Sequence, residues 1–459
     1  MQIAKVECRS KRPGSGILCG FSTFAICILN LAICTILASS PAADLLTLDR
    51  AVSIALDSNR TYRAAVLDAR TAAEAVSWGG AGALPKVDAT ASYSKSVNDT
   101  RQVRVGAAPE EKSGAESTSK LAGVTGTWTV FEGLSSLAAH KRLEANAGLA
   151  DARREQGRQA VASQVVLAYG DVVRQARVLA AVDSAVALSR ERVKITQGKY
   201  GFGGTSKLEL LQAQLDLNAD LSARLRQSLA LDAAKRGLNR LLARPDTLAF
   251  AAEDSIPLSD VPDLEALRAR ARESSPTLRQ AALGRALSDA AFREYVGKLF
   301  PAVGLSLGYN YNLAESQAGF LRSNEAAGLS YGVNVRMNLF DGFTLRDDWR
   351  AARRSRSKAD LQYRDALDEL EAAFSGAAQA YRASRQELEL ETANVGLARE
   401  NMAIARERLR LGTIASLELR AAQEKFVAAE TRLVSARFES KRAETQLLLL
   451  AGGLAPSPR

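Results

Sequence analysis

Side chains that could perform chemistry are scarce in this sequence. It has one histidine, His140, and the last of its four cysteines is Cys34. This composition argues against histidine-based catalysis, Cys/His zinc centres and a disulfide framework in the rest of the chain. The glycine-rich segment 201–206 superficially suggests a phosphate-binding loop, but it lacks the lysine of such loops and follows no predicted strand. We therefore predict no catalytic residue, no metal site, no cofactor and no enzymatic activity.

Composition narrows the class of protein further. The chain has 459 residues, of which 47% are hydrophobic and 24% charged, with only 11 prolines. It is too apolar and too poor in proline to be mainly disordered, and it is long enough to bury a sizeable core. The net charge of +10 is spread along the chain without basic blocks interleaved with aromatic residues. This pattern indicates a solvated basic surface and no nucleic-acid partner.

The amino terminus is typical of an export signal. A basic segment, residues 5–12, precedes an apolar run over residues 17–37, and small residues follow that suit cleavage after position 42 or 43. We predict a signal peptide over residues 1–43. Retention of the apolar run as a membrane anchor is an alternative, because about 20 apolar residues can span a bilayer. Lipidation at Cys34 is a minority alternative, because isoleucine precedes it where that signal requires a small residue.

The remainder of the chain is a tandem repeat. Phe131 and Gly133 recur as Phe340 and Gly342, and positions in the following segments recur with the same offset in residue number. Farther upstream, equivalent residues are separated by seven more positions. The second repeat must therefore be seven residues shorter in a segment before Phe131, where loops are expected. An Ala-Tyr pair at 168–169 recurs at 380–381, with an offset larger by three. Either the two pairs are not equivalent, or each half contains small compensating gaps.

Each repeat is predicted to contain a helix, two strands and two long helices. The proline-free segment 49–78 predicts the first helix, and alternating apolar and polar residues predict the strands. Long proline-free stretches predict helical hairpins, with the longer helix extending about 100 Å. The polar segments 95–120 and 313–327 are expected to be loops between strands. The predicted bounds are 44–247 for repeat 1, with strands at about 86–94 and 121–131 and long helices at about 134–200 and 206–243, and 262–454 for repeat 2, with strands at about 302–312 and 328–340 and long helices at about 344–409 and 415–451.

The predicted strands have one apolar and one polar face, a pattern typical of outer-membrane barrels. In the last strand, Tyr331, Val333, Val335 and Leu339 alternate with polar residues and are expected to face lipid. A soluble antiparallel sheet with one buried face is the alternative. Four strands cannot close a barrel, which needs about eight or more, so several chains must contribute. Strand counting alone permits a dimer with eight strands.

With this twofold plan, the sequence resembles the outer membrane efflux protein family of TolC-like channels over essentially all of the chain after the signal. The resemblance rests on Phe131 and Gly133, on Phe340 and Gly342, and on two hairpin-tip motifs, residues 200–203 followed by 208–211 and residues 408–412 followed by 416–419. It implies a mixed α and β membrane protein that forms a homotrimer. Each chain would give four strands to one twelve-stranded transmembrane β-barrel, which a long periplasmic α-helical barrel of coiled-coil hairpins continues.

The resemblance also implies functional positions at the hairpin tips. Tyr200, Gly203, Leu409 and Gly412 are expected to form the tips that dock the adaptor, although Leu409 replaces the usual tyrosine. A tight turn at the two glycines is expected to require positive φ.

Two carboxylates near these tips are candidates for a periplasmic gate. Glu209 and Glu418 each lie six residues after a tip glycine, where the family closes its channel with acidic residues, although Ala421 stands where some members have a second acid. A ring of six carboxylates at a constriction would attract cations and repel anions. Alternatively, each glutamate is simply a first-turn residue that the helix dipole favours.

Two classes of function are therefore compared. The favoured one is a passive trimeric exit duct in the outer membrane of a Gram-negative bacterium, with its helices in the periplasm, serving tripartite efflux or type I secretion. Its implied partners are outer-membrane lipid, a periplasmic adaptor (membrane fusion protein) and an inner-membrane ABC or proton-driven pump. The alternative is a non-conducting periplasmic coiled-coil scaffold or adaptor, anchored by an uncleaved amino-terminal helix.

Overall fold

The chain divides into two compact units. The computed structural model describes residues 44–103, 105–106, 108–259, 263–318 and 321–454. The predicted signal peptide, the alternative anchor and Cys34 lie outside these described residues. Strand β1 (Asp44–Leu46) pairs with β4 (Phe250–Ala252) in a two-stranded sheet, and apart from Ala252 these residues belong to the smaller unit.

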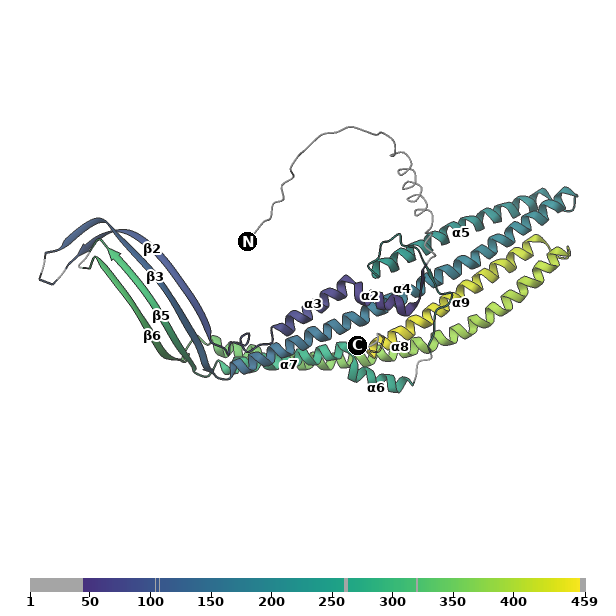
Figure 1. The fold of residues 1–459 in the computed structure, drawn as a ribbon. Coiled ribbons are helices and arrows are strands. Elements are labelled where there is room, and N and C mark those ends of the chain that lie inside the picture. Colours follow the sequence, from purple (N-terminus) through teal and green to yellow (C-terminus); the bar gives the residue numbers. More distant parts are fainter. Residues whose placement is uncertain (1–43, 104, 107, 260–262, 319–320, 455–459) are drawn as a thin grey trace, which may run out of the picture. The chain divides into compact units, whose positions relative to one another are not determined.

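The larger unit repeats one order of elements: two short helices, two strands and two long helices (Figure 1). The first half consists of α2 (Leu48–Ser58), α3 (Arg60–Glu74), β2 (Lys86–Gln102), β3 (Glu110–Glu132), α4 (Ser135–Gly201) and α5 (Lys207–Leu241). The second half consists of α6 (Leu264–Ser274), α7 (Pro276–Gly297), β5 (Ala302–Ser316), β6 (Ser323–Arg336), α8 (Thr344–Arg410) and α9 (Ser416–Leu450).

The single helix predicted over residues 49–78 is wrong, because the chain breaks it at Asn59. This residue has extended backbone angles, and its side-chain oxygen accepts hydrogen bonds from the backbone N–H groups of Thr61 and Tyr62. Asparagine in this role caps the start of a new helix, so α2 ends where α3 begins. Ser275 breaks the second repeat at the equivalent place, with nearly the same backbone angles and with proline at the first position of α7.

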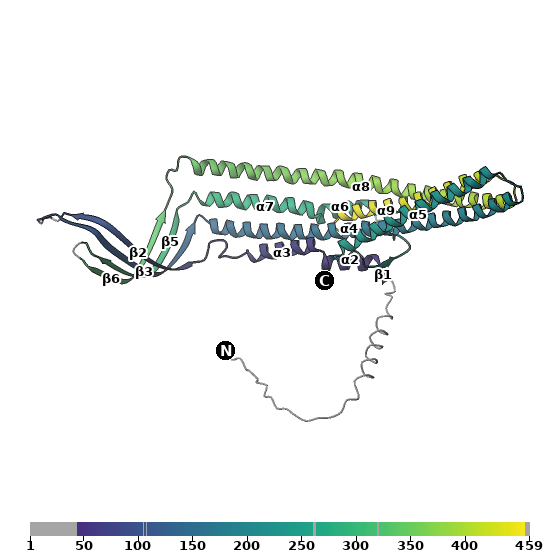
Figure 2. The same cartoon turned by 90° about the horizontal axis from the view of Figure 1, so that it is seen from above.

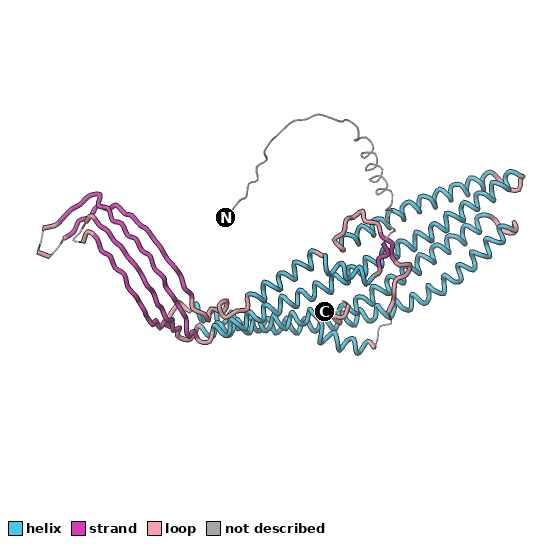
Figure 3. The backbone as a smooth tube through the Cα atoms, viewed as in Figure 1, coloured by secondary structure: helices cyan, strands magenta, loops and turns pink. Residues whose placement is uncertain are grey.

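Four strands form one antiparallel sheet in the order β2-β3-β5-β6 (Figure 3). The central pair joins the two repeats, with Thr125 opposite Gly308. Neighbouring strands keep the alternation in register, so that Trp128 lies beside Leu305 and Leu305 beside Val333. One face of the sheet is therefore apolar and the other polar.

The loops predicted at 95–120 and 313–327 are largely wrong, because the strands continue far into them. Residue pairs run from Lys86 opposite Thr127 to Gln102 opposite Glu110. Polar cross-strand partners accompany this extension, including an ion pair of 2.9 Å between Lys95 and Glu116. A criterion based on apolar alternation does not detect strands whose side chains are polar.

The long helices have the same lengths in both repeats. α4 and α8 each contain 67 residues, and α5 and α9 each contain 35. At about 1.5 Å per residue the longer pair spans about 100 Å. α4 and α8 are continuous and equal in length. Counted from the first residue of its own helix, Tyr381 lies three positions later than Tyr169. The two Ala-Tyr pairs are therefore not equivalent.

Helices α3, α4, α7 and α8 lie side by side in this order near the sheet (Figure 2). The core runs along α4, whose buried side chains are mostly alanine and valine, small enough for close helix packing. By contrast, large side chains on α5 and α8, such as Leu215 and Leu397, are exposed in the single chain. Among the described residues, no helix combines the length and the apolar character needed to cross a bilayer.

Candidate functional site

Each hairpin ends in a tight turn that contains a glycine with positive φ. Gly203 has φ +75° and donates its N–H to the carbonyl of Tyr200 at 3.1 Å. Gly412 has φ +77° and donates to the carbonyl of Leu409 at 3.0 Å. The expected positive φ at both tips is confirmed, and it explains the choice of glycine, because other residues adopt this conformation only with strain.

The side chains exposed at the tips differ from those expected. Leu409 is only 3% exposed and packs with Ala405, Leu419 and Ala422, so in this chain it stabilises the hairpin and offers no docking surface. Tyr200 is partly exposed, as docking requires.

Sequence reasoning overlooked the most exposed apolar side chains next to the tip glycines, Phe202 at 96% and Leu411 at 66%. They occupy equivalent positions in the two repeats, each directly before its glycine. This shared position could have identified them.

The two gate candidates have different surroundings. The Glu209 carboxylate accepts a hydrogen bond from the Thr205 hydroxyl, and its backbone N–H donates to Ser206, the N-cap of α5, at 3.2 Å. Its local role is thus the first-turn role considered as the alternative. Glu418 also lies in the first turn of its helix, α9, but it is exposed, and among the described residues no side-chain partner engages its carboxylate.

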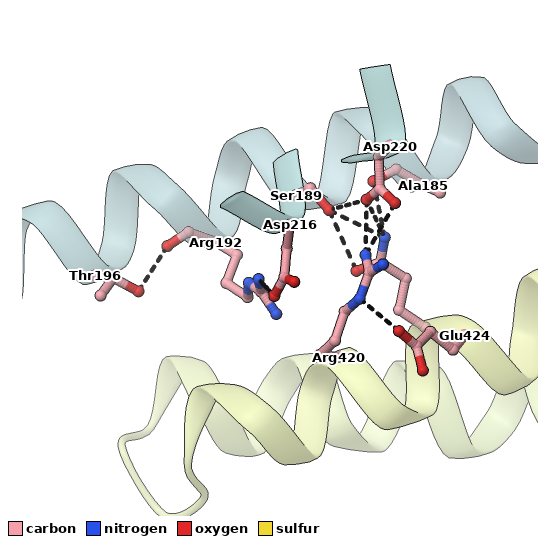
Figure 4. A network of polar contacts seen from close by, with 9 residues as sticks. Ala185, Ser189, Arg192, Thr196, Asp216, Asp220, Arg420 and Glu424 are labelled. Atoms are coloured by element: carbon pink, nitrogen blue, oxygen red, sulfur yellow. Dashed lines mark hydrogen bonds and ion pairs between the residues drawn. The ribbon is translucent and has the colours of Figure 1, made fainter. Parts of the chain in front are cut away.

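A polar network farther along the hairpins connects the two repeats (Figure 4). Asp220 of α5 accepts hydrogen bonds from Ser189 of α4 at 2.5 Å, and from Arg420 at 2.8 Å and Gln423 at 3.1 Å, both of α9. The side chains of Asp220 and Arg420 are only 12% and 16% exposed. Three helices therefore meet around one carboxylate whose hydrogen bonds stabilise its charge.

The arginine side chains in and near this network are paired with carboxylates. Burial opposes the charged form of Arg420, but hydrogen bonding to Asp220 and its negative charge outweigh this effect and raise the pKa of the guanidinium above its ordinary value. Arg192 of α4, almost fully buried, pairs with Asp216 of α5. On the surface, Arg406 of α8 binds Glu191 of α4 at 2.8 Å. Ion pairs thus connect the two hairpins at more than one position along their length.

Sequence reasoning missed this network. The available signal was Asp216 and Asp220, two acids one helical turn apart beside the apolar stripe of α5. Like charges at this spacing repel one another on an isolated helix, so their presence indicates cationic partners. Periodicity could not show that α9 would supply one of these cations.

The strand-to-helix motifs form turns with two successive positive φ values. Gly133 has φ +55° and Leu134 φ +66°, and in repeat 2 Gly342 has +70° and Phe343 +69°. A Cβ atom on Gly133 would lie 2.2 Å from the carbonyl oxygen of Gly297 in α7. The first motif therefore requires glycine both for its backbone angles and for the close approach of another chain segment.

The four predicted lipid-facing residues divide into two groups. Tyr331, Val333 and Val335 lie on the apolar face of β6, where their register partners on β5 are also apolar. Leu339 does not belong to this strand, because β6 ends at Arg336. The prediction that the strand continues to residue 340 is wrong for the single chain. β6 is an edge strand, and residues 337–340 pair with no other strand among the described segments.

Comparison with protein-family models gives a match to the family described as "Outer membrane efflux protein" over residues 51–244 and 267–453. The chain belongs to this family. Outer membrane efflux proteins are transport channels and not enzymes. Membership of this family places the protein in the outer membrane, with its helical part in the periplasm.

Solved outer-membrane channels have the same fold. The Campylobacter jejuni CmeC channel is similar with a TM-score of 0.76 and 16% identity, over 88% of this chain and 85% of CmeC. VceC from Vibrio cholerae has a TM-score of 0.73 and 16% identity, over 88% of this chain and 96% of VceC. The channel OprN has a TM-score of 0.72 and 21% identity, over 88% of this chain and 90% of OprN. No curated protein sequence matches the chain significantly.

Proposed function

We propose that this efflux protein is the passive, homotrimeric exit duct of a tripartite efflux or type I secretion assembly. Three copies supply four strands each to one barrel, and their long helices continue the barrel as a tunnel through the periplasm. The supporting observation is the four-stranded sheet, which has an apolar face, a polar face and an open edge on each side. Such a sheet is stable in lipid only when other copies cover its edges.

The dimensions and chemistry of the sheet support this function. The apolar face of β5 runs from Val303 to Tyr311, a distance of about 27 Å at about 3.4 Å per residue, which matches the apolar band of an outer-membrane barrel. Over the same stretch the opposite face carries Gly304, Ser306, Gly308 and Asn310. These small, uncharged side chains would line a hydrated lumen that passes solutes of either charge.

The hairpin tips are the proposed docking site for the periplasmic adaptor, which links the duct to an inner-membrane ABC or proton-driven pump. Phe202 and Leu411 offer an exposed apolar side chain beside each glycine turn. The Asp220 and Arg420 network restrains separation of the two hairpins of one chain, because opening between them would leave a charged pair incompletely solvated.

Glu209 and Glu418 are the proposed gate. Replacement of both by glutamine removes six negative charges from a trimer with little change in side-chain size. We expect single-channel recordings to show reduced cation preference and weaker block by multivalent cations, with trimer yield unaltered. Unchanged selectivity and block would assign both residues to helix starts alone.

The test of the duct is reconstitution of the purified protein in planar bilayers after cross-linking in mild detergent. We expect a cross-linked trimer and discrete conductance steps. A stable monomer with full β content would contradict the shared barrel. A trimer without conductance would instead favour a non-conducting periplasmic scaffold.

A further inference from the structure

The first four turns of α8, which follow the last strand of the sheet, are strongly basic. Between residues 344 and 358 they contain two carboxylates and six cations. The cations are Arg346, Arg350, Arg353, Arg354, Arg356 and Lys358. The corresponding first turns of α4, residues 135–149, contain two cations and one carboxylate. The excess of positive charge therefore belongs to one repeat only, so the shared backbone plan does not require it.

Three of these arginines are exposed and only weakly neutralised. Arg346 and Arg350 share one carboxylate, Asp347, at 3.7 and 3.5 Å, longer than the roughly 2.7–2.9 Å of a strong charged hydrogen bond. Arg353 has no ion-pair partner in the part of the chain that the structure describes. Like charges one helical turn apart repel one another, so this spacing of the three arginines indicates an anionic partner outside the chain.

The guanidinium groups point toward the sheet. Side chains on a helix lean toward its amino-terminal end, and α8 begins beside the strands (Figure 2). The guanidinium of Arg346 stacks over the ring of Phe343 at 4.5 Å, and that of Arg353 over the ring of Trp349 at 5.7 Å. Each ring belongs to a residue three or four positions nearer to the strands than its arginine. The aromatic rings thus hold the positive charges toward the end of the sheet.

Helix α6 identifies the side of α8 on which these arginines lie. Arg268 of α6 binds Glu371 of α8 at 2.6 Å. Glu371 follows Arg353 by about five helical turns and Arg346 by about seven, so the three residues share one face of α8. α2 packs against α4 as α6 packs against α8, and these short helices would obstruct a tunnel if they lay inside it. In the proposed duct this face of α8 is therefore the outer one.

An apolar cavity lies beside the first of these arginines. It has a volume of about 410 Å³, and its lining includes Leu299, Leu339, Phe343 and Arg346. Arg346 lies about 3 Å along α8 from its first residue and Arg350 about 9 Å, within reach of a headgroup layer that extends roughly 5–8 Å beyond the hydrocarbon. An apolar cavity with a cationic rim matches a phospholipid, whose acyl chains adjoin a charged headgroup.

We propose that Arg346, Arg350 and Arg353 bind the anionic headgroup of a phospholipid in the periplasmic leaflet of the outer membrane, with its acyl chains against the cavity beside Arg346. The residues at the equivalent positions of repeat 1 are Leu137, Lys141 and Glu144. Only one of them is a cation, so one repeat of each chain binds such a headgroup. The proposal rests on the proposed function, because it requires the sheet to lie in lipid, and it adds a preference for lipids with a negative headgroup.

The experiment measures which lipid contacts Trp349. The sequence contains three tryptophans, so W78F with W128F leaves Trp349 as the last one. The full-length protein in this background is reconstituted in phosphatidylcholine vesicles that contain a minor fraction of phosphatidylglycerol. Either lipid is supplied with brominated acyl chains, which quench tryptophan fluorescence on contact. We expect phosphatidylglycerol to be enriched at Trp349 by at least about fivefold, the factor that one basic side chain contributes near an anionic surface.

R346Q combined with R350Q and R353Q should abolish this enrichment, because three positive charges are lost with little change in side-chain length. R350Q alone should lower it severalfold. K141Q is the matched control, because it removes an exposed cation from the equivalent position of repeat 1 and should leave the enrichment unchanged. The protein with its native tryptophans gives a second test that does not depend on the phenylalanine substitutions. After purification in detergent it should retain phosphatidylglycerol, and the triple variant should not.

The outcomes separate this site from the duct. Equal or absent quenching by both lipids, an enrichment that survives the triple substitution, or equal losses from R350Q and K141Q would overturn the site while a conducting trimer remains. Loss of the enrichment in inorganic phosphate, but not in sodium chloride of equal ionic strength, would overturn a lipid as the ligand. If neither lipid quenches Trp349 and the protein forms no conducting trimer, the proposed function fails together with the site.

Discussion

The two repeats have the same backbone plan but different chemistry where their hairpins meet. Their long helices are equal in length, and glycines with positive φ recur at the tips and at the strand-to-helix turns. The polar network is not repeated. The residues at the positions equivalent to Asp220 and Arg420 in the other repeat are Ala429 and Leu211, so those positions cannot form a second charged pair of this kind.

This difference separates the residues that fix the shared backbone geometry from the side chains that make contacts specific to one pair of helices. The turn glycines and the lengths of the long helices recur because both halves enter the same sheet and the same helix layer. Side chains between helices can diverge as long as buried polar groups keep partners. The result is a polar connection within each chain, between α4, α5 and α9.

Gly133→Ala should have the largest effect. The new Cβ would lie 2.2 Å from a backbone oxygen of α7, which cannot move as a flexible side chain would. We expect a loss of more than about 4 kcal/mol and little folded protein. Gly342→Ala adds the same methyl group in open space of the chain and should cost its folding only about 1 kcal/mol, from positive φ. Folded yield and thermal unfolding provide the measurement, and equal losses would contradict the asymmetry.

Arg420→Ala should destabilise the contact between hairpins by about 3 kcal/mol, because Asp220 would keep its charge in a largely buried position. A double-mutant cycle with Asp220→Asn measures the coupling, and the double variant should lose less than the sum of the single losses. The readouts are the unfolding midpoint and the open fraction in single-channel recordings. Additive losses would show that the two side chains act independently.

Val335→Arg should cost about 2–4 kcal/mol if the residue lies near the bilayer midplane, because it places a charge on the apolar face of β6, the proposed lipid face. Asn334→Arg, one residue away on the polar face, is the control and should be much milder. Urea unfolding in lipid vesicles measures both. Similar losses would indicate that the two faces have been assigned incorrectly.

Ala243→Gly should have the smallest effect and the opposite sign. Ala243 has φ +52°, whereas its counterpart Gly452 has φ +66° with the residue type suited to it. The substitution should stabilise the protein by about 1 kcal/mol by relieving strain. Gly452→Ala should destabilise it by more, because the added Cβ would lie 2.7 Å from the carbonyl oxygen of Ser274. Thermal unfolding measures both, and a destabilising Ala243→Gly would contradict the strain at this position.

The sequence was most informative where a local pattern repeats. Proline-free stretches located α4 and α8 to within a residue or two, and the tip glycines indicated their own backbone angles. It was less informative where polar residues form strands, as in residues 95–102, or where a single side chain such as Asn59 divides a helical stretch. In these places a cross-strand partner or a cap decides the structure, and neither changes the apolar period.

At the candidate site, the twofold plan, the glycine turns and the positions of the two glutamates after them could be predicted from the sequence, because they depend on residue type and spacing along one chain. The burial of Leu409, the hydrogen bond of Glu209 at the start of α5 and the contact of Asp220 with Arg420 became visible only in the folded chain. Asp220 and Arg420 are 200 residues apart in sequence. Their contact depends on how α5 and α9 pack against α4, and side-chain periodicity within each helix carries no information about which other helix will lie beside it.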